Sequence, residues 1–159
     1  VALGLLEQKI PAHLLVIGEG DFTALEKLPG DVCTRLPWME QDRLPALISM
    51  YDAHPFTYSG DAPFYFSQLK LAEAMACGAV AVVPDLGDLP SMVRHEQDGR
   101  VYKAGDRAAL ISGLMRLAGF IDFINRLAHN AAEAARMHGW EHIVTRILDQ
   151  LGLTRGVRA

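Results

Sequence analysis

Short apolar runs alternate with amphipathic segments along most of the chain. The clearest runs, residues 13–18 and 79–83, are continuous apolar stretches that end at Gly18 and Pro84. Such runs are typical of strands buried on both faces of a parallel sheet. We therefore expect residues 13–18 to form a central strand. Shorter candidate strands cover residues 32–34, 54–58 and 101–102, the last of them at an edge.

Amphipathic segments between these runs predict helices. Strands and helices alternate with short connections, which predicts an α/β fold: a Rossmann-like parallel sheet flanked by helices on both faces. Serine and aspartate are favoured at the N-cap position of a helix. Gly78 follows a predicted helix directly, at the position where a residue with left-handed backbone conformation often ends it. The expected helices are residues 43–51 (N-cap Asp42), 68–77 (N-cap Ser67), 89–94, 107–117 (N-cap Asp106), 121–137 and 140–151.

The length of the chain fits one domain. A chain of 159 residues, half of them hydrophobic, can bury one core and leaves little room for a second domain. We expect the domain to cover residues 1–152 and to be followed by a disordered tail, residues 153–159. Residues 2–7 are typical of the end of a helix that leads directly into a strand, so we expect the first strand of the sheet to be missing.

Composition and charge disfavour several functions. The formal net charge is -4 and the basic residues are scattered, which disfavours nucleic acid as a partner. No apolar run approaches the roughly 20 residues that span a bilayer, so we expect no membrane insertion. Cys33 and Cys77 lack paired spacing, which favours a reducing, cytoplasmic setting. His138 and His142 lack the further ligands of a zinc site, and we expect no metal.

The loops after the predicted strands are the places to seek function, because the carboxyl ends of parallel strands meet at one edge of a sheet. These loops are residues 18–21, 35–39, 59–65 and 84–88. The helix that begins near Ser67 directs its amino terminus at this edge, and the backbone amides and dipole of such a terminus attract a diphosphate.

Glu73 lies nearly two turns along that helix, among small and apolar residues. A lone carboxylate in such surroundings needs hydrogen-bond donors, which two vicinal ribose hydroxyls would supply. A simpler interpretation stays open, in which Ser67 is an ordinary helix cap and Glu73 pairs with a neighbour such as Lys70.

The same stretch carries a family resemblance. Residues 73–83, EAMACGAVAVV, resemble the EAMACG-PVVA signature of the retaining glycosyltransferases often called family 4, in their carboxyl-terminal, donor-binding domain. Residues 15–20, LVIGEG, are similar to that family's L-x-I-x-G-x-G strand and turn, and Trp140 resembles the tryptophan that opens its last helix. The likeness runs in order from residue 13 to residue 150 and implies one half of a GT-B fold.

The resemblance assigns roles to several residues. It implies that the backbone amides of Ser67, Gln68 and Leu69 bind the diphosphate of a nucleoside diphosphate sugar and that Glu73 binds its ribose. The donor base would lie against the loop formed by Arg35, Leu36 and Pro37, and the resemblance does not say which base this is. It implies no metal and no further cofactor.

The chain departs from the family pattern near the sugar. The family commonly has a glutamate that contacts the sugar eight positions before Glu73, and here that position is Tyr65. Residues 60–70 resemble a longer loop, GDAPFYFSPLK, of some members, in which Asp61 would supply the missing carboxylate. We assign no catalytic residue.

Two functions from different classes follow. The full-length protein would transfer a sugar from a nucleoside diphosphate sugar to an acceptor, and it would need a preceding acceptor domain, so this chain alone would bind the donor at best. The alternative, which Tyr65 favours, is a non-catalytic Rossmann-like interaction module with a degenerate pocket. In either case the apolar residues Ile143, Ile147 and Leu151 of the last helix are expected to be exposed and to favour self-association.

Overall fold

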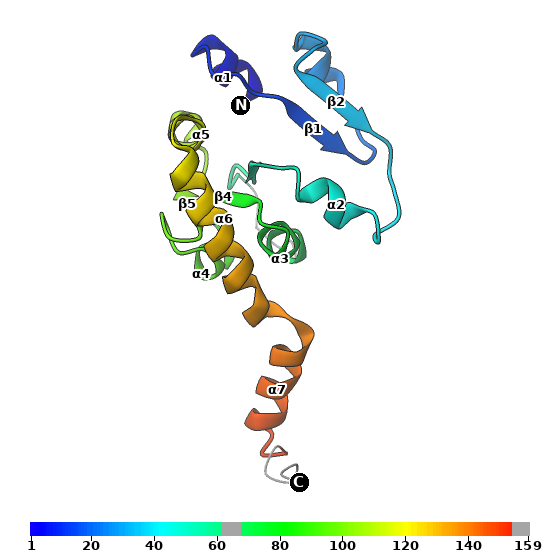
Figure 1. The fold of residues 1–159 in the computed structure, drawn as a ribbon, viewed down its shortest axis with the longest axis vertical. Helices are drawn as coiled ribbons and strands as arrows, with labels where there is room; N and C mark the ends of the chain where they lie inside the picture. Colours follow the sequence, from blue (N-terminus) through cyan, green and yellow to red (C-terminus); the bar gives the residue numbers. More distant parts are fainter. Residues whose placement is uncertain (62–67, 154–159) are drawn as a thin grey trace.

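The computed structural model describes residues 1–61 and 68–153, which form an α/β fold with parallel strands (Figure 1). The strands are β1 (Leu14–Ile17), β2 (Cys33–Leu36), β3 (Ala53–Pro55), β4 (Val80–Pro84) and β5 (Gly99–Tyr102). The helices are α1 (Ala2–Glu7), α2 (Leu44–Ile48), α3 (Leu69–Ala76), α4 (Leu89–Met92), α5 (Arg107–Gly119), α6 (Ile121–Ala135) and α7 (Trp140–Gln150), with short 3-10 turns at Thr23–Lys27 and Arg136–His138.

Hydrogen bonds divide the described strands into two parallel sheets. One has the order β1-β2 and the other the order β3-β4-β5. The expectation of a parallel sheet flanked by helices is confirmed, but β1 is not the central, fully buried strand that its apolar run predicts. Among the described residues it pairs with β2 alone, and all four of its residues are only half-buried because its other edge lacks a neighbouring strand.

Strand β4 forms the centre of the core. All five of its residues are buried, as its apolar sequence predicts. Successive side chains of a strand point to opposite faces: Ala81 and Val83 belong to a cluster with α3 and α4, and Val80 and Val82 to a cluster with α1 and α5. Helix α6 contributes to both clusters. The strand is therefore covered by helices on both faces.

Two predicted helix ends are confirmed and two predicted N-caps are wrong, since the N-cap residue of α3 is Gln68 and not Ser67. The Asp106 side chain accepts a hydrogen bond from the Ala109 amide at 2.8 Å and caps α5, and Gly78 has the left-handed φ of 79°. Asp42 does not cap α2. The N-cap residue is Arg43, because a backbone turn precedes the helix. In this turn the carbonyls of Glu40 and Gln41 accept hydrogen bonds from the amides of Arg43 and Leu44.

A tight turn before β5 is held by buried and charged groups. The Asp98 side chain is fully buried and accepts hydrogen bonds from the backbone amide (2.6 Å) and Nε (2.5 Å) of Arg94. Next to it, a Cβ on Gly99 would lie 2.8 Å from the carbonyl oxygen of Ala81, so only glycine allows the close approach of β5 to β4.

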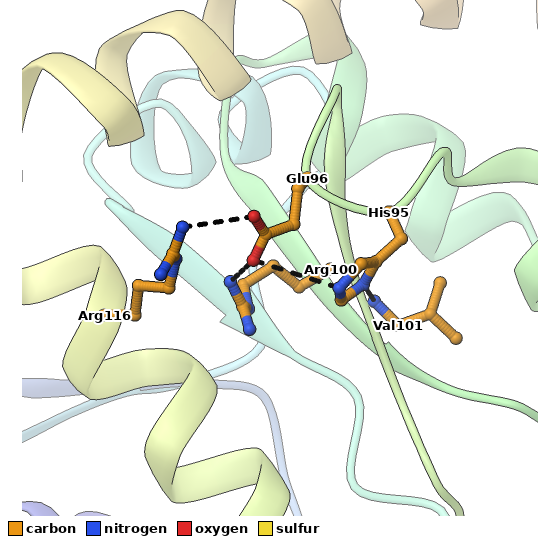
Figure 2. Close-up of polar contacts among 5 residues, drawn as sticks. All are labelled: His95, Glu96, Arg100, Val101 and Arg116. Carbon is orange, nitrogen blue, oxygen red and sulfur yellow. Dashed lines mark hydrogen bonds and ion pairs between the residues drawn. The ribbon is translucent and has the colours of Figure 1, made fainter.

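Glu96 links this turn to α5 (Figure 2). Its carboxylate accepts hydrogen bonds from Arg100 at 2.5 Å and Arg116 at 3.2 Å, and His95 Nδ1 accepts the Val101 amide at 3.0 Å. Desolvation raises the pKa of Glu96, but the hydrogen bond and charge of Arg100, with the charge of Arg116, outweigh it, so that the pKa lies below its usual value. This ion-pair network is structural, since its groups satisfy one another.

Helix α7 extends away from the rest of the domain (Figure 1) and has no buried residue. The predicted exposure is confirmed for Ile147 and Leu151, whereas Ile143 is half-buried. Trp140, at the start of the helix, is 76% exposed. Among the described residues no single helix is long and apolar enough to cross a membrane, although α5 and the residues 121–138 meet these criteria as a pair bent by 106°.

Candidate functional site

An open pocket of about 500 Å³ lies at the carboxyl ends of β1 and β2. It brings together the turn after β1 and the end of β2, as the sequence predicts, although Arg35 and Leu36 are the last two residues of β2 and not part of a loop, because they pair with Val16 and Ile17 of β1. The guanidinium carbon of Arg35 lies 4.1 Å from the centre of the Phe22 ring, so the charged group stacks on one wall of the pocket. The pocket is lined by Gly18, Glu19, Gly20, Phe22, Arg35, Leu36 and Pro37.

The loops after β3 and β4 also meet. A Cβ on Gly60 would lie 3.2 Å from the Leu86 side chain. The Asp85 carboxylate also accepts a hydrogen bond from the Ala104 amide at 2.6 Å, which joins the loop after β4 to the segment after β5. Asp61, which follows Gly60, is exposed. The described residues therefore join the four predicted loops in two pairs, one at the end of each sheet.

The amino terminus of α3 lies at Gln68, the N-cap residue, whose side chain makes no capping hydrogen bond. The first bonds of the helix run from the amides of Leu71 and Ala72 to the Gln68 carbonyl. Gln68 and Leu69 are thus at the helix end where the sequence predicts phosphate contacts. Tyr65 and Ser67, the other residues predicted there, lie outside the described residues.

Glu73 is half-buried, and its Oε1 accepts a hydrogen bond from Gln41 Nε2 at 3.2 Å. Within the described part of the chain it forms no ion pair with Lys70, so the partner that the simpler interpretation assigns to this carboxylate is replaced by Gln41. Gln41 follows Pro37 by four residues, so the chain that leaves the pocket reaches Glu73. Sequence reasoning missed Gln41, because a polar loop residue carries no periodic signal.

His54, on β3, packs between aromatic rings. Its ring stacks on Phe56 with 4.6 Å between centroids and meets Tyr51 edge-on at 5.6 Å. Its Nδ1 is buried and has no hydrogen-bond partner in the described residues. Burial lowers the pKa of His54, and the positive charge of Lys70 lowers it further.

This environment predicts an acid-sensitive stability. The folded-state pKa of His54 lies below the unfolded value of about 6.5, so only the unfolded chain takes up the proton as the pH first falls below that value. Above about pH 6.5 the titration of His54 therefore does not lower the free energy of unfolding. As the pH falls from there through the lower folded-state pKa, the free energy of unfolding decreases. In urea denaturation at pH 7.5 and 5.5, we expect His54→Gln to lose less stability on acidification than the unsubstituted protein. Equal losses would show that His54 carries none of this dependence.

A second open pocket, of about 620 Å³, is formed by the bend between α5 and α6 rather than by strand ends. Arg116 and Arg126 lie over the Phe123 ring in its wall, at 5.1 and 5.3 Å from the ring centre. Nothing in the sequence predicts this pocket. In the described ranges, 1–61 and 68–153, no three His, Cys, Asp or Glu side chains are grouped so that they could hold a metal ion.

A family model described as Glycosyl transferases group 1 matches residues 2–119, which is most of the chain. The chain belongs to the group 1 glycosyltransferases. The predicted resemblance is confirmed at this level, and the assignment to family 4 stays a prediction.

Other proteins are similar to this group 1 domain. The phosphatidyl-myo-inositol mannosyltransferase of Mycobacterium leprae (strain TN) is 27% identical over 146 residues, 91% of this chain and 39% of that protein. The crystal structure of Anabaena HepE in complex with UDP matches with a TM-score of 0.72 at 19% identity, covering 95% of this chain and 43% of HepE. The carboxyl-terminal domain of the LpcC glycosyltransferase from Francisella tularensis has a TM-score of 0.56 at 12% identity, covering 86% of this chain and 91% of that domain.

These coverages agree with the predicted half of a GT-B fold. The chain spans about two fifths of the mannosyltransferase and most of a solved carboxyl-terminal domain. The fold of this group 1 glycosyltransferase domain is therefore that of a carboxyl-terminal GT-B half.

Proposed function

We propose that this chain is the donor-binding domain of a glycosyltransferase and holds a nucleoside diphosphate sugar at the carboxyl ends of its strands. The observation that carries the proposal is the contact of Glu73 with Gln41, which joins α3 to the loop behind the β1–β2 pocket. This contact connects the residue proposed to bind the ribose with the segment that leaves the pocket proposed for the base. The UDP bound to HepE supports the same ligand class.

The chemistry of each group suits its proposed role. The amide side chain of Gln41 now donates to Glu73 Oε1, and a ribose hydroxyl would donate to the same oxygen in its place. The backbone amides at Gln68 and Leu69, with that of Ser67, would receive the diphosphate, because a helix amino terminus favours an anion. Asp61 would reach the sugar. No metal or cofactor is required by this arrangement.

Transfer would need a partner that completes the sheet and binds the acceptor. Within the described residues, β1 and β3 each have one edge without a strand partner. A parallel strand between them would give the order 3-2-1-4-5-6 of a doubly wound sheet. Helix α1 leads into β1 and packs on α5, so a right-handed crossover would place that strand before α1.

An acceptor domain attached to that strand would cover the apolar side chains of α7. Without it, the same side chains would favour association of two copies of this chain. The stabilisation of the departing diphosphate and the positioning of the acceptor would be shared by the two halves.

The test is calorimetric titration of the chain with UDP, GDP and ADP. We expect saturable binding of at least one diphosphate, and a roughly tenfold or greater loss of affinity in Glu73→Ala, since hydrogen bonds to a charged group are worth about 1.5–3 kcal/mol. The matched control is Glu133→Ala, whose side chain is exposed and pairs only with Arg136 at 3.4 Å in the described chain; it should bind as tightly as the unsubstituted protein. Absence of binding by a folded sample would favour the interaction-module alternative.

A further inference from the structure

We propose that the base of the donor is guanine and that Arg35 and Glu19 select it. This inference rests on the proposed function, since it names the base that the β1–β2 pocket would receive. Both side chains line that pocket, from the ends of neighbouring parallel strands, and both are exposed to an incoming ligand.

Arg35 is held in place without being neutralised. Its guanidinium stacks on Phe22, and neither Arg35 nor Glu19 forms an ion pair among the residues that the structure describes. Stacking uses the face of the guanidinium and leaves its N–H donors at the edges, where they can reach a planar group in the pocket.

The two charged groups present opposite hydrogen-bonding character. A guanidinium only donates, and a carboxylate only accepts. Guanine matches both, because O6 and N7 are adjacent acceptors that suit the arginine fork, while N1–H and the exocyclic N2 amino group donate to a carboxylate. Adenine has an amino group beside N7, so one arginine donor would face another donor. Uracil offers only one carbonyl oxygen beside its N3–H on either side, so it cannot satisfy the fork with two adjacent acceptors.

The position of the pocket agrees with a nucleoside. The chain that forms one wall at Leu36 and Pro37 continues to Gln41, whose amide contacts Glu73. The proposed base pocket and the proposed ribose ligand Glu73 are therefore joined by one short segment of chain. Arg35 and Glu19 would then set the preference for one base, and Glu73, which Gln41 contacts, would bind the ribose.

The experiment measures dissociation constants for GDP, UDP and ADP with the unsubstituted chain and with Arg35→Gln and Glu19→Gln. We expect GDP to bind about tenfold more tightly than ADP, in the range that one bidentate arginine contact supplies. Arg35→Gln should shift the preference toward ADP, because a glutamine amide matches N6 and N7 of adenine. Glu19→Gln should weaken GDP more than ADP. Arg146→Gln, an exposed change on α7, is the control and should leave all three constants unchanged.

The outcomes separate this inference from the proposed function. Similar affinities for the three diphosphates, or a GDP to ADP ratio that Arg35→Gln leaves unchanged, would overturn the choice of guanine and leave donor binding intact. Failure of all three to bind the folded chain would overturn both.

Discussion

Replacing Asp98 by alanine is expected to lower the free energy of unfolding by about 2 kcal/mol, within the range for hydrogen bonds to a charged group. The Arg94 side chain is 63% exposed, so water can solvate its charge after the change. The carboxylate is fully buried and accepts both the amide and the Nε of Arg94. Its loss leaves that amide without its acceptor and loosens the turn that leads into β5. Urea denaturation followed by circular dichroism measures the change.

Two further substitutions sharpen this prediction. Asp98→Asn keeps an acceptor for the Arg94 amide and should cost less than the alanine change. Asp88→Ala removes an exposed carboxylate at the N-cap position of α4 that makes no capping hydrogen bond, and it should stay within about 0.5 kcal/mol of the unsubstituted protein. If Asp98→Ala were as stable as Asp88→Ala, the carboxylate would not hold the turn.

Replacing Leu127 by alanine is expected to cost about 3 kcal/mol, within the range of about 2–5 kcal/mol for such changes in a core. Leu127 lies on α6, is fully buried, and packs in the cluster that contains Val80 and Val82 of β4. The change removes apolar contacts and leaves a cavity beside the central strand. Thermal unfolding monitored by circular dichroism would record a lower Tm.

The matched control lies on the same helix. Ile121 is 68% exposed, so Ile121→Ala removes a similar volume with little loss of burial and should change the free energy of unfolding by less than about 0.5 kcal/mol. Equal effects of the two changes would mean that α6 does not pack as described.

The elements that sequence reasoning predicted well carry their signal locally. The apolar run of β4, the Asp106 cap of α5 and the left-handed Gly78 each depend on a few neighbouring residues. The order of motifs also predicted the glycosyltransferase group, because several weak patterns in the right sequence are more specific than any one alone.

The features that were missed depend on distant contacts. The apolar run of β1 predicts burial on both faces, but burial also requires strands on both edges, and the described residues supply a partner on one. The contact between Gln41 and Glu73 joins residues 32 positions apart, and the turn that replaces Asp42 as the start of α2 uses backbone groups. Neither leaves a periodic pattern in the sequence.

The most direct test of the account is to map the nucleotide on the domain by NMR, from changes in backbone amide resonances when GDP or UDP is added. The account predicts that the largest changes lie at Gln68 to Lys70, Glu73 and the β1–β2 pocket, with α7 unaffected. Changes confined to the pocket at the α5–α6 bend, or no changes at millimolar nucleotide in a folded sample, would contradict a donor site at the carboxyl ends of the strands.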